Sequence, residues 1–277
     1  TAVVSWIGYD APSGHPIKLG RETATQQFAE AGGHRLAHDV AGIVGSRSDS
    51  PNVHLFGHSY GSTTTAHAGV GGRLAGYVST VTLLGSPGAG PLTHARDFGI
   101  GPENVYVASA SRDVVTWTGS HMDGTPNRAS TYLQNLSTST FVGAVEGRYG
   151  SLTNLAMGVS NLADRLSGRL SGLGQGFDPA MSEFGANRLA AQYSSPEHLG
   201  GIKPHTRYFS SEEFNGKDPV LLRDNTNARV TESLDNFSHI LTGNTDQLSL
   251  ETNHRDPSAM FGDPARGRTA VPALGYP

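Results

Sequence analysis

The chain has 277 residues, no cysteine and a formal net charge of −4, from 20 basic and 24 acidic side chains. This composition excludes disulfides and thiolate metal sites, and the lack of a basic stripe argues against nucleic acid as a partner. No apolar run is long enough for a transmembrane helix. Few charges with abundant Gly, Ser and Thr are compatible with a secreted or cell-envelope protein, and the length suits one large α/β domain or two small ones.

The first half of the chain alternates between predicted strands and helices. The nearly continuous apolar run at residues 2–9 is typical of a strand buried on both faces. Strands are expected at 2–9, 53–57, 78–84 and 104–110, and helices at about 22–45 and 60–70. This alternation predicts a mostly parallel sheet covered by helices on both faces.

The second half has a different pattern. Leucines recur at three- and four-residue steps over 152–173, which predicts an amphipathic helix inside a helical insertion at about 119–200. The insertion is either a lid or cap over a site, or a helical layer packed on the sheet. A last helix is expected at 225–242, so that residues 1–242 form one domain. The polar, proline-containing residues 243–277 predict an extended tail that lies along the body or along a neighbouring subunit.

The most informative motif is Gly57-His58-Ser59-Tyr60-Gly61, which follows a short apolar run and precedes a run of small residues. The order strand, sharp turn, helix is typical of a nucleophile elbow, where a strained serine projects its hydroxyl above the sheet. Both glycines are expected to be required by the close approach of strand and helix. The alternative is an ordinary strand-to-helix turn with an inert serine.

An activated serine needs a base, and the base needs an orienting acid. Asp113 stands just after the predicted strand at 104–110, where catalytic groups of a parallel sheet gather. It is therefore the preferred acid, with Asp97 and Asp123 as alternatives. Chain order leaves the base open, since the chain has twelve histidines. The candidates are His205, in a loop-like setting before the last helix, and its rivals His198, His239 and His121.

Other histidines have simpler interpretations. His34 and His38 have the spacing of two zinc ligands on a helix, but no third ligand is suggested, and a solvated helix face is the preferred interpretation. His58 is expected to pack beneath the elbow. No metal or other cofactor is therefore predicted.

Together these stretches resemble the actinobacterial alpha/beta hydrolase family first catalogued as a domain of unknown function. The matching stretches are Val4–Pro12, Gly57–Ser62, Leu84–Gly88, Phe177–Pro179 with Phe184–Ala186, and His205 with Tyr208. The resemblance implies an α/β-hydrolase-like fold and a serine hydrolase with Ser59, Asp113 and His205 as its triad. It implies no particular substrate, and residues of about 130–172 look longer than the family pattern.

The chain departs from the family at its start. In this fold, one oxyanion-hole N–H comes from the loop after a strand that is expected upstream of residue 1. Either the chain is one fragment of a processed or truncated protein, with the upstream fragment as a partner, or the loop at Tyr9-Asp10 has taken over the role. The backbone N–H of Tyr60 is the other expected donor.

These observations predict a serine esterase or lipase-like acyl hydrolase acting on a small-molecule or lipid-like ester. A rival hypothesis is a non-catalytic α/β-hydrolase scaffold for binding or assembly, including assembly with a second copy through the tail. Another rival is an N-terminal nucleophile hydrolase that uses Thr1, which the elbow pattern disfavours.

Overall fold

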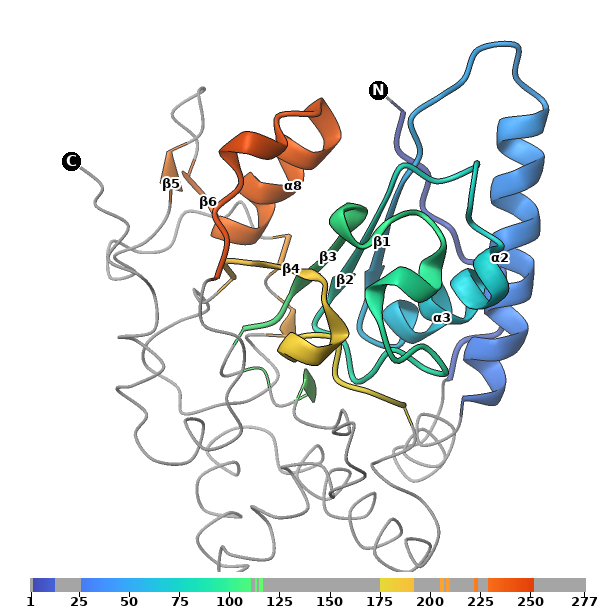
Figure 1. The fold of residues 1–277 in the computed structure, drawn as a ribbon, viewed down its shortest axis with the longest axis horizontal. Helices are drawn as coiled ribbons and strands as arrows, with labels where there is room; N and C mark the ends of the chain where they lie inside the picture. The colour runs from blue at the N-terminus through green and yellow to red at the C-terminus, as the bar shows by residue number, and fades with distance from the viewer. Residues whose placement is uncertain are drawn as a thin grey trace, which may run out of the picture.

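A four-stranded parallel sheet forms the centre of the molecule (Figure 1). The structure, a computed structural model, describes residues 2–12, 26–110, 113, 115–116, 175–191, 205–206, 208–209, 222–223 and 229–251. The strands of the sheet are, in spatial and chain order, β1 (His54–His58), β2 (Thr80–Leu84), β3 (Val105–Ala108) and β4 (Asn187–Leu189). All three pairings are parallel, with His58 opposite Leu84 and Leu84 opposite Ala108. The carboxyl ends of the strands therefore meet at one edge of the sheet.

The helices cover both faces of this sheet. Helix α2 (Gln27–Gly45) and helix α3 (Tyr60–Gly69) lie on one face, and helix α8 (Glu232–Thr242) lies on the other (Figure 1). Side chains alternate along a strand, so Leu83 and Val107 join the core under α2 and α3, whereas Leu84 and Ala108 join the core under α8. The prediction of a mostly parallel sheet covered on both faces is confirmed.

Short elements connect and extend these layers. The described residues include the one-turn 3-10 helices η1 (Val70–Gly72), η2 (Ala95–Phe98), η3 (Pro102–Asn104), η5 (Ser182–Phe184) and η6 (Thr245–Gln247). A separate antiparallel pair consists of β5 (Leu222–Arg223) and β6 (Arg229–Val230). The last helix, predicted at 225–242, begins only at Glu232. Thr231 caps its N-terminus by accepting a hydrogen bond from the Leu234 N–H.

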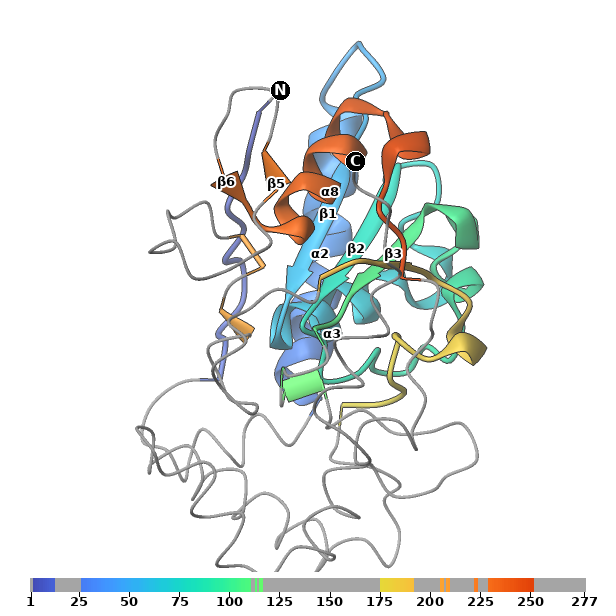
Figure 2. The ribbon, with the colours of Figure 1, turned by 90° about the vertical axis from the view of Figure 1, so that its left-hand side faces the viewer.

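The expected strand at residues 2–9 does not form. No strand is assigned in this described segment, and Val3, Val4 and Ile7 are 87%, 72% and 88% exposed. Figure 2 shows it running alongside the sheet as an irregular extended segment. A buried strand needs neighbours for its backbone and for both of its faces. The described hydrogen bonds of residues 2–9 are instead made with side chains of α2.

Side chains of α2 fix this N-terminal segment. The Trp6 indole N–H donates to Asp39 at 2.8 Å, and Arg35 donates to the Gly8 carbonyl at 3.2 Å. The indole bond also lowers the pKa of the exposed Asp39 carboxyl. The Tyr9 ring stacks on Trp6 with ring centroids 5.7 Å apart.

The segments 175–191 and 248–251 belong to the body of the fold. Residues 187–189, which the sequence predicts to be part of the helical insertion, form β4 of the main sheet. Residues 248–251 run beside β4, where the Glu251 N–H donates to the Arg188 carbonyl and the Ala190 N–H donates to the Ser249 carbonyl. The predicted helix at 152–173 and the tail beyond residue 251 lie outside the described residues.

Candidate active site

Ser59 occupies the turn between β1 and α3 in a strained backbone conformation. Its φ and ψ are 56° and −130°, and among the described residues it is the one non-glycine residue with positive φ. The turn is held from both sides, because the Ser59 N–H donates to the Leu84 carbonyl at 2.9 Å and the Ser62 hydroxyl donates to the Ser59 carbonyl at 2.6 Å. Such strain persists only where the surroundings enforce it, and it is the geometry expected of the nucleophile elbow that the sequence predicts.

The residues around the turn explain its tight packing. A Cβ at Gly57 would lie 2.6 Å from the Thr65 hydroxyl and 2.8 Å from the Gly61 carbonyl, so the predicted need for glycine at this position is confirmed. The same prediction for Gly61 is wrong, because a Cβ there would meet open space. Ser62 also lies 2.7 Å from the Ser86 hydroxyl, which links the elbow to the turn after β2.

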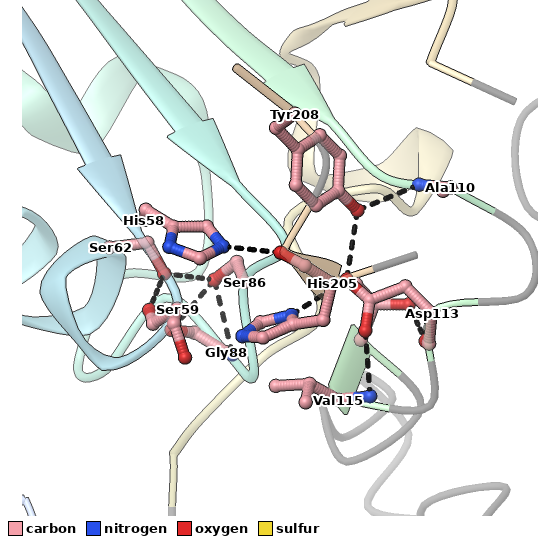
Figure 3. A network of polar contacts seen from close by, with 11 residues as sticks. His58, Ser59, Ser62, Ser86, Gly88, Ala110, Asp113, Val115, His205 and Tyr208 are labelled. Atoms are coloured by element: carbon pink, nitrogen blue, oxygen red, sulfur yellow. Dashed lines mark hydrogen bonds and ion pairs between the residues drawn. The ribbon is translucent and has the colours of Figure 1, made fainter. Parts of the chain in front are cut away.

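Asp113 and His205 form a buried pair above the ends of β2 and β3 (Figure 3). The His205 Nδ1 lies 2.9 Å from the Asp113 Oδ2, and the two side chains are 7% and 0% exposed. The other carboxylate oxygen, Oδ1, accepts the Val115 N–H at 2.9 Å. Because a carboxylate only accepts hydrogen bonds, the bond from His205 to Asp113 places the imidazole proton on Nδ1. The other ring nitrogen, Nε2, is then the one that could act as a base.

Two aromatic side chains hold this pair in place. The Tyr208 hydroxyl lies 2.9 Å from the Asp113 Oδ2 and accepts the Ala110 N–H at 3.0 Å. His58 donates from Nε2 to the His205 carbonyl at 2.7 Å, and its ring lies 4.6 Å from the His205 ring. Burial, and then the neighbouring His205, lower the pKa of His58, so His58 is a neutral donor here and not a second base.

The elbow and the buried pair lie next to each other. In Figure 3 the His205 imidazole lies between the Asp113 carboxylate and Ser59. His58, the residue before Ser59, bonds directly to the His205 backbone. No hydrogen bond joins the Ser59 hydroxyl to His205 among the described residues. Catalytic contacts are often longer in the absence of substrate and tighten when it binds.

The two predicted oxyanion donors are placed differently. Tyr60 is the first residue of α3, so its N–H lies at the positive end of the helix, directly after Ser59. Tyr9 lies at the crossing of α2 and α3, where a Cβ on Gly32 would meet the Tyr9 ring and the Thr64 methyl. Among the described residues, no hydrogen bond joins Tyr9 to the elbow.

The alternative site residues have other surroundings. The Asp97 carboxylate accepts the Thr93 and His94 N–H groups at the start of η2, and His239 lies 3.6 Å from Asp235 on α8. His34 accepts a hydrogen bond from Arg73, and the exposed His38 lies beside Asp39. Asp123, His121 and His198 are outside the described residues. Within the described part of the chain, no group of three or more acidic or histidine side chains could hold a metal ion.

Sequence reasoning missed the supporting residues of the pair. The contact of Tyr208 with Asp113 was not predicted, although Tyr208 stands three positions after His205 in the stretch that carries the resemblance. The role of Gly85 was not predicted either: a Cβ there would lie 2.9 Å from Asp113, His205 and Tyr208 atoms. The Gly-Ser-Pro-Gly sequence after β2 was the available signal, but it entered the sequence analysis only as part of the stretch Leu84–Gly88 that carries the resemblance.

Known proteins support the class of fold. The model of a family described as alpha/beta hydrolase matches residues 1–123, which include Ser59 and Asp113 but not His205. With the parallel sheet and its helices, this match gives the chain an α/β-hydrolase-like fold and a hydrolase scaffold.

Similar proteins come from mycobacteria. An uncharacterized protein of Mycobacterium tuberculosis is 29% identical over 282 residues, covering 100% of this chain and 35% of that relative. An uncharacterized protein of Mycobacterium bovis is 33% identical over 117 residues, 42% of this chain and 41% of its own length. The chain thus spans about a third of the relatives that it matches throughout. No solved structure matches it. In the described residues, no helix is both long and apolar enough to cross a membrane.

The buried histidines predict a loss of stability in mild acid. Burial lowers the pKa of His58 and of His67 from the ordinary value of 6.5. As the pH falls below 6.5, the unfolded chain takes up protons on these residues before the folded chain does, so the free energy of unfolding must fall. Thermal melts from about pH 7.5 to about pH 5.5 should show this decrease. His67→Gln should reduce the slope, whereas the exposed His38→Gln should leave it unchanged. Equal slopes in all three proteins would contradict the assignment.

Proposed function

We propose that this chain is a serine hydrolase that cleaves carboxylic esters through Ser59, His205 and Asp113. The observation that carries the proposal is the strained elbow at Ser59, with φ of 56°, beside a buried histidine–aspartate pair at 2.9 Å. Neither feature is needed to complete the sheet. Together they supply the nucleophile, base and orienting acid that acyl transfer requires.

Each residue has a defined step. The Ser59 hydroxyl attacks the ester carbonyl while His205 Nε2 takes its proton, and the Asp113 carboxylate holds the resulting imidazolium through Nδ1. The Tyr60 N–H faces the negative oxygen of the tetrahedral intermediate, and the bend at Tyr9 is the candidate for the second donor. His205 then returns the proton to the leaving alcohol. Water attacks the acyl-enzyme by the same route and releases the acid.

The substrate class follows from the side chains near the pair. His58 and Phe209 have ring centroids 6.4 Å apart, and Phe209 is 50% exposed next to Tyr208. An uncharged acyl ester, small or lipid-like, therefore suits the site better than a charged substrate. A series of p-nitrophenyl esters from acetate to palmitate would define the preferred acyl length.

The competing proposal is a scaffold that binds without catalysis. It is favoured by one observation, that the Ser59 hydroxyl has no hydrogen bond to His205 among the described residues. A scaffold of this kind needs neither a reactive serine nor a free imidazole Nε2. The two proposals therefore differ in whether Ser59 reacts with an electrophile.

A fluorophosphonate probe distinguishes them, because it labels an activated serine and leaves an inert one unmodified. The parent chain should gain one covalent adduct, located on the peptide that contains Ser59. Ser59→Ala should abolish labelling, and Ser48→Ala, in an exposed loop, should label like the parent. Labelling of Ser59→Ala at the parental rate, or an unreactive parent, would favour the scaffold.

A further inference from the structure

Three hydrogen-bond donors converge on the Asp113 carboxylate, and one of them is the Tyr208 hydroxyl. Oδ1 accepts from the Val115 N–H, whereas Oδ2 accepts from both His205 Nδ1 and Tyr208, each at 2.9 Å. Tyr208 is 3% exposed and Asp113 is fully buried, so water cannot replace this donor. Figure 3 shows the Tyr208 hydroxyl aimed at the carboxylate from the side opposite Val115.

The direction of the tyrosine proton is fixed by its surroundings. A phenol hydroxyl has one proton to donate and can also accept. Because the Ala110 N–H donates to the Tyr208 oxygen at 3.0 Å, the single hydroxyl proton is left for Asp113. The rest of Tyr208 is held as well, since its backbone carbonyl accepts from the Ser233 hydroxyl at 2.7 Å.

Tyr208 therefore joins three parts of the candidate site. Its hydroxyl connects the segment that carries His205 to Asp113 and to Ala110 at the end of β3. Its ring packs in the core cluster under α8. A residue that only filled space at this position would need the ring but not the hydroxyl. The two hydrogen bonds give the hydroxyl a purpose that packing does not explain.

We propose that Tyr208 is a positioning residue, whose hydroxyl orients the Asp113 carboxylate and shares its Oδ2 with His205. The inference rests on the proposed serine hydrolase function for its effect on rate. The contact between the Tyr208 hydroxyl and Asp113 can be tested independently of activity. Tyr208→Phe removes the hydroxyl and keeps the ring. The labelling rate of Ser59 should then fall about 10- to 100-fold, the range for losing one hydrogen bond to a charged group.

The matched control is Tyr106→Phe. Tyr106 lies on β3 in the same core cluster and is also buried. Among the described residues it has no hydrogen bond to Asp113 or His205. The same substitution there should leave the labelling rate at the parental value. A fall in rate in both variants would indicate a general effect of core substitution and would overturn the assignment.

Proton NMR of the full chain gives a readout that packing alone would not move. The His205 Nδ1–H signal is assigned by its loss in His205→Gln. In Tyr208→Phe it should shift downfield, because Oδ2 no longer divides its charge between two donors. Incorporation of 2,3-difluorotyrosine at position 208, a stronger donor of the same shape, should shift it upfield, and this variant also covers the case in which Tyr208→Phe does not fold.

The outcomes separate the two proposals. A signal that stays at its parental position in both Tyr208 variants would overturn the positioning role, whatever the labelling result. Opposite shifts in the two variants, with Tyr106→Phe unchanged, would support it. If the Tyr208 variants show these shifts but the parent chain is not labelled at Ser59, the serine hydrolase function is overturned and the contact of Tyr208 with Asp113 still stands.

Discussion

Asp113→Asn should slow the acylation of Ser59 about 10⁴-fold, the size of effect known for loss of the orienting acid in a serine triad. The asparagine amide can donate to His205 Nδ1, which would move the imidazole proton to Nε2. An imidazole that already carries its proton on Nε2 cannot take one from Ser59. The rate of fluorophosphonate labelling and the hydrolysis of p-nitrophenyl acetate both measure this loss.

The same substitution also disturbs a buried set of donors. In the parent protein, three donors point at the two carboxylate oxygens of Asp113. The asparagine amide of the variant offers only one oxygen. One donor must face the amide N–H₂ group, which costs about 1–3 kcal/mol of unfolding free energy. Chemical denaturation would measure this cost, and labelling of the folded fraction would show that the loss of rate is not due to unfolding.

Asp97→Asn is the matched control, because Asp97 was the rival acid in the sequence. Its carboxylate accepts backbone N–H groups at the start of η2, and an asparagine oxygen can accept the same bonds. Its labelling rate should equal that of the parent. A large loss of rate in Asp97→Asn, with Asp113→Asn fully active, would reverse the assignment of the acid.

Most of the sheet could be predicted from sequence because local pattern and tertiary position agree there. The runs at 53–57, 78–84 and 104–110 are rich in β-branched and apolar residues, and each contains a strand of the structure. β4 was missed, since its three residues Asn187–Leu189 carry no alternation that a strand pattern could reveal. Its place comes from pairing with β3 and from the backbone bonds of residues 249–251.

At residues 2–9 the sequence predicts a strand that the structure does not contain, which is the reverse of the error at β4. An apolar run indicates that a segment can be buried, but a strand needs a partner edge that sequence does not display. In the structure, Trp6 and Tyr9 meet α2, whereas Val3, Val4 and Ile7 point to solvent. Composition could not separate these two groups of apolar residues.

In the candidate site too, residues marked by a local sequence pattern could be predicted, and residues placed only by tertiary contacts could not. Ser59 could be selected as a candidate because the local Gly57–Gly61 motif marks it, although its conformation is held by the Leu84 carbonyl as well as by Ser62. Asp113 followed from its place after a strand. His205 could not be chosen by spacing, since it meets His58 across 147 positions and its contact with Asp113 is purely tertiary. The resemblance selected it among the histidines, and the Tyr208 hydroxyl bond had no local pattern to predict it.

Gly85→Ala should damage both the stability of the fold and the reactivity of Ser59. Gly85 follows β2 with φ of +53°, a conformation that costs an alanine about 1–2 kcal/mol. An added Cβ would also lie 2.9 Å from Asp113 Oδ2, His205 Nδ1 and Tyr208 Cε2. Relieving that contact in a packed interior costs about 1–3 kcal/mol more. It also requires the histidine–aspartate pair to move away, and a displacement of about 1 Å can reduce a rate about 100-fold.

Gly185→Ala separates the two causes. Gly185 has φ of +75°, so alanine is strained there as well, but its Cβ would meet nothing within 4 Å. This variant should show only the backbone cost in denaturation and should label Ser59 at the parental rate. The difference between the two variants measures the contact of position 85 with the pair. If Gly85→Ala lost no more stability than Gly185→Ala and labelled as fast as the parent, the pair could not lie against Gly85 in the reactive state, and the proposed triad would need another arrangement.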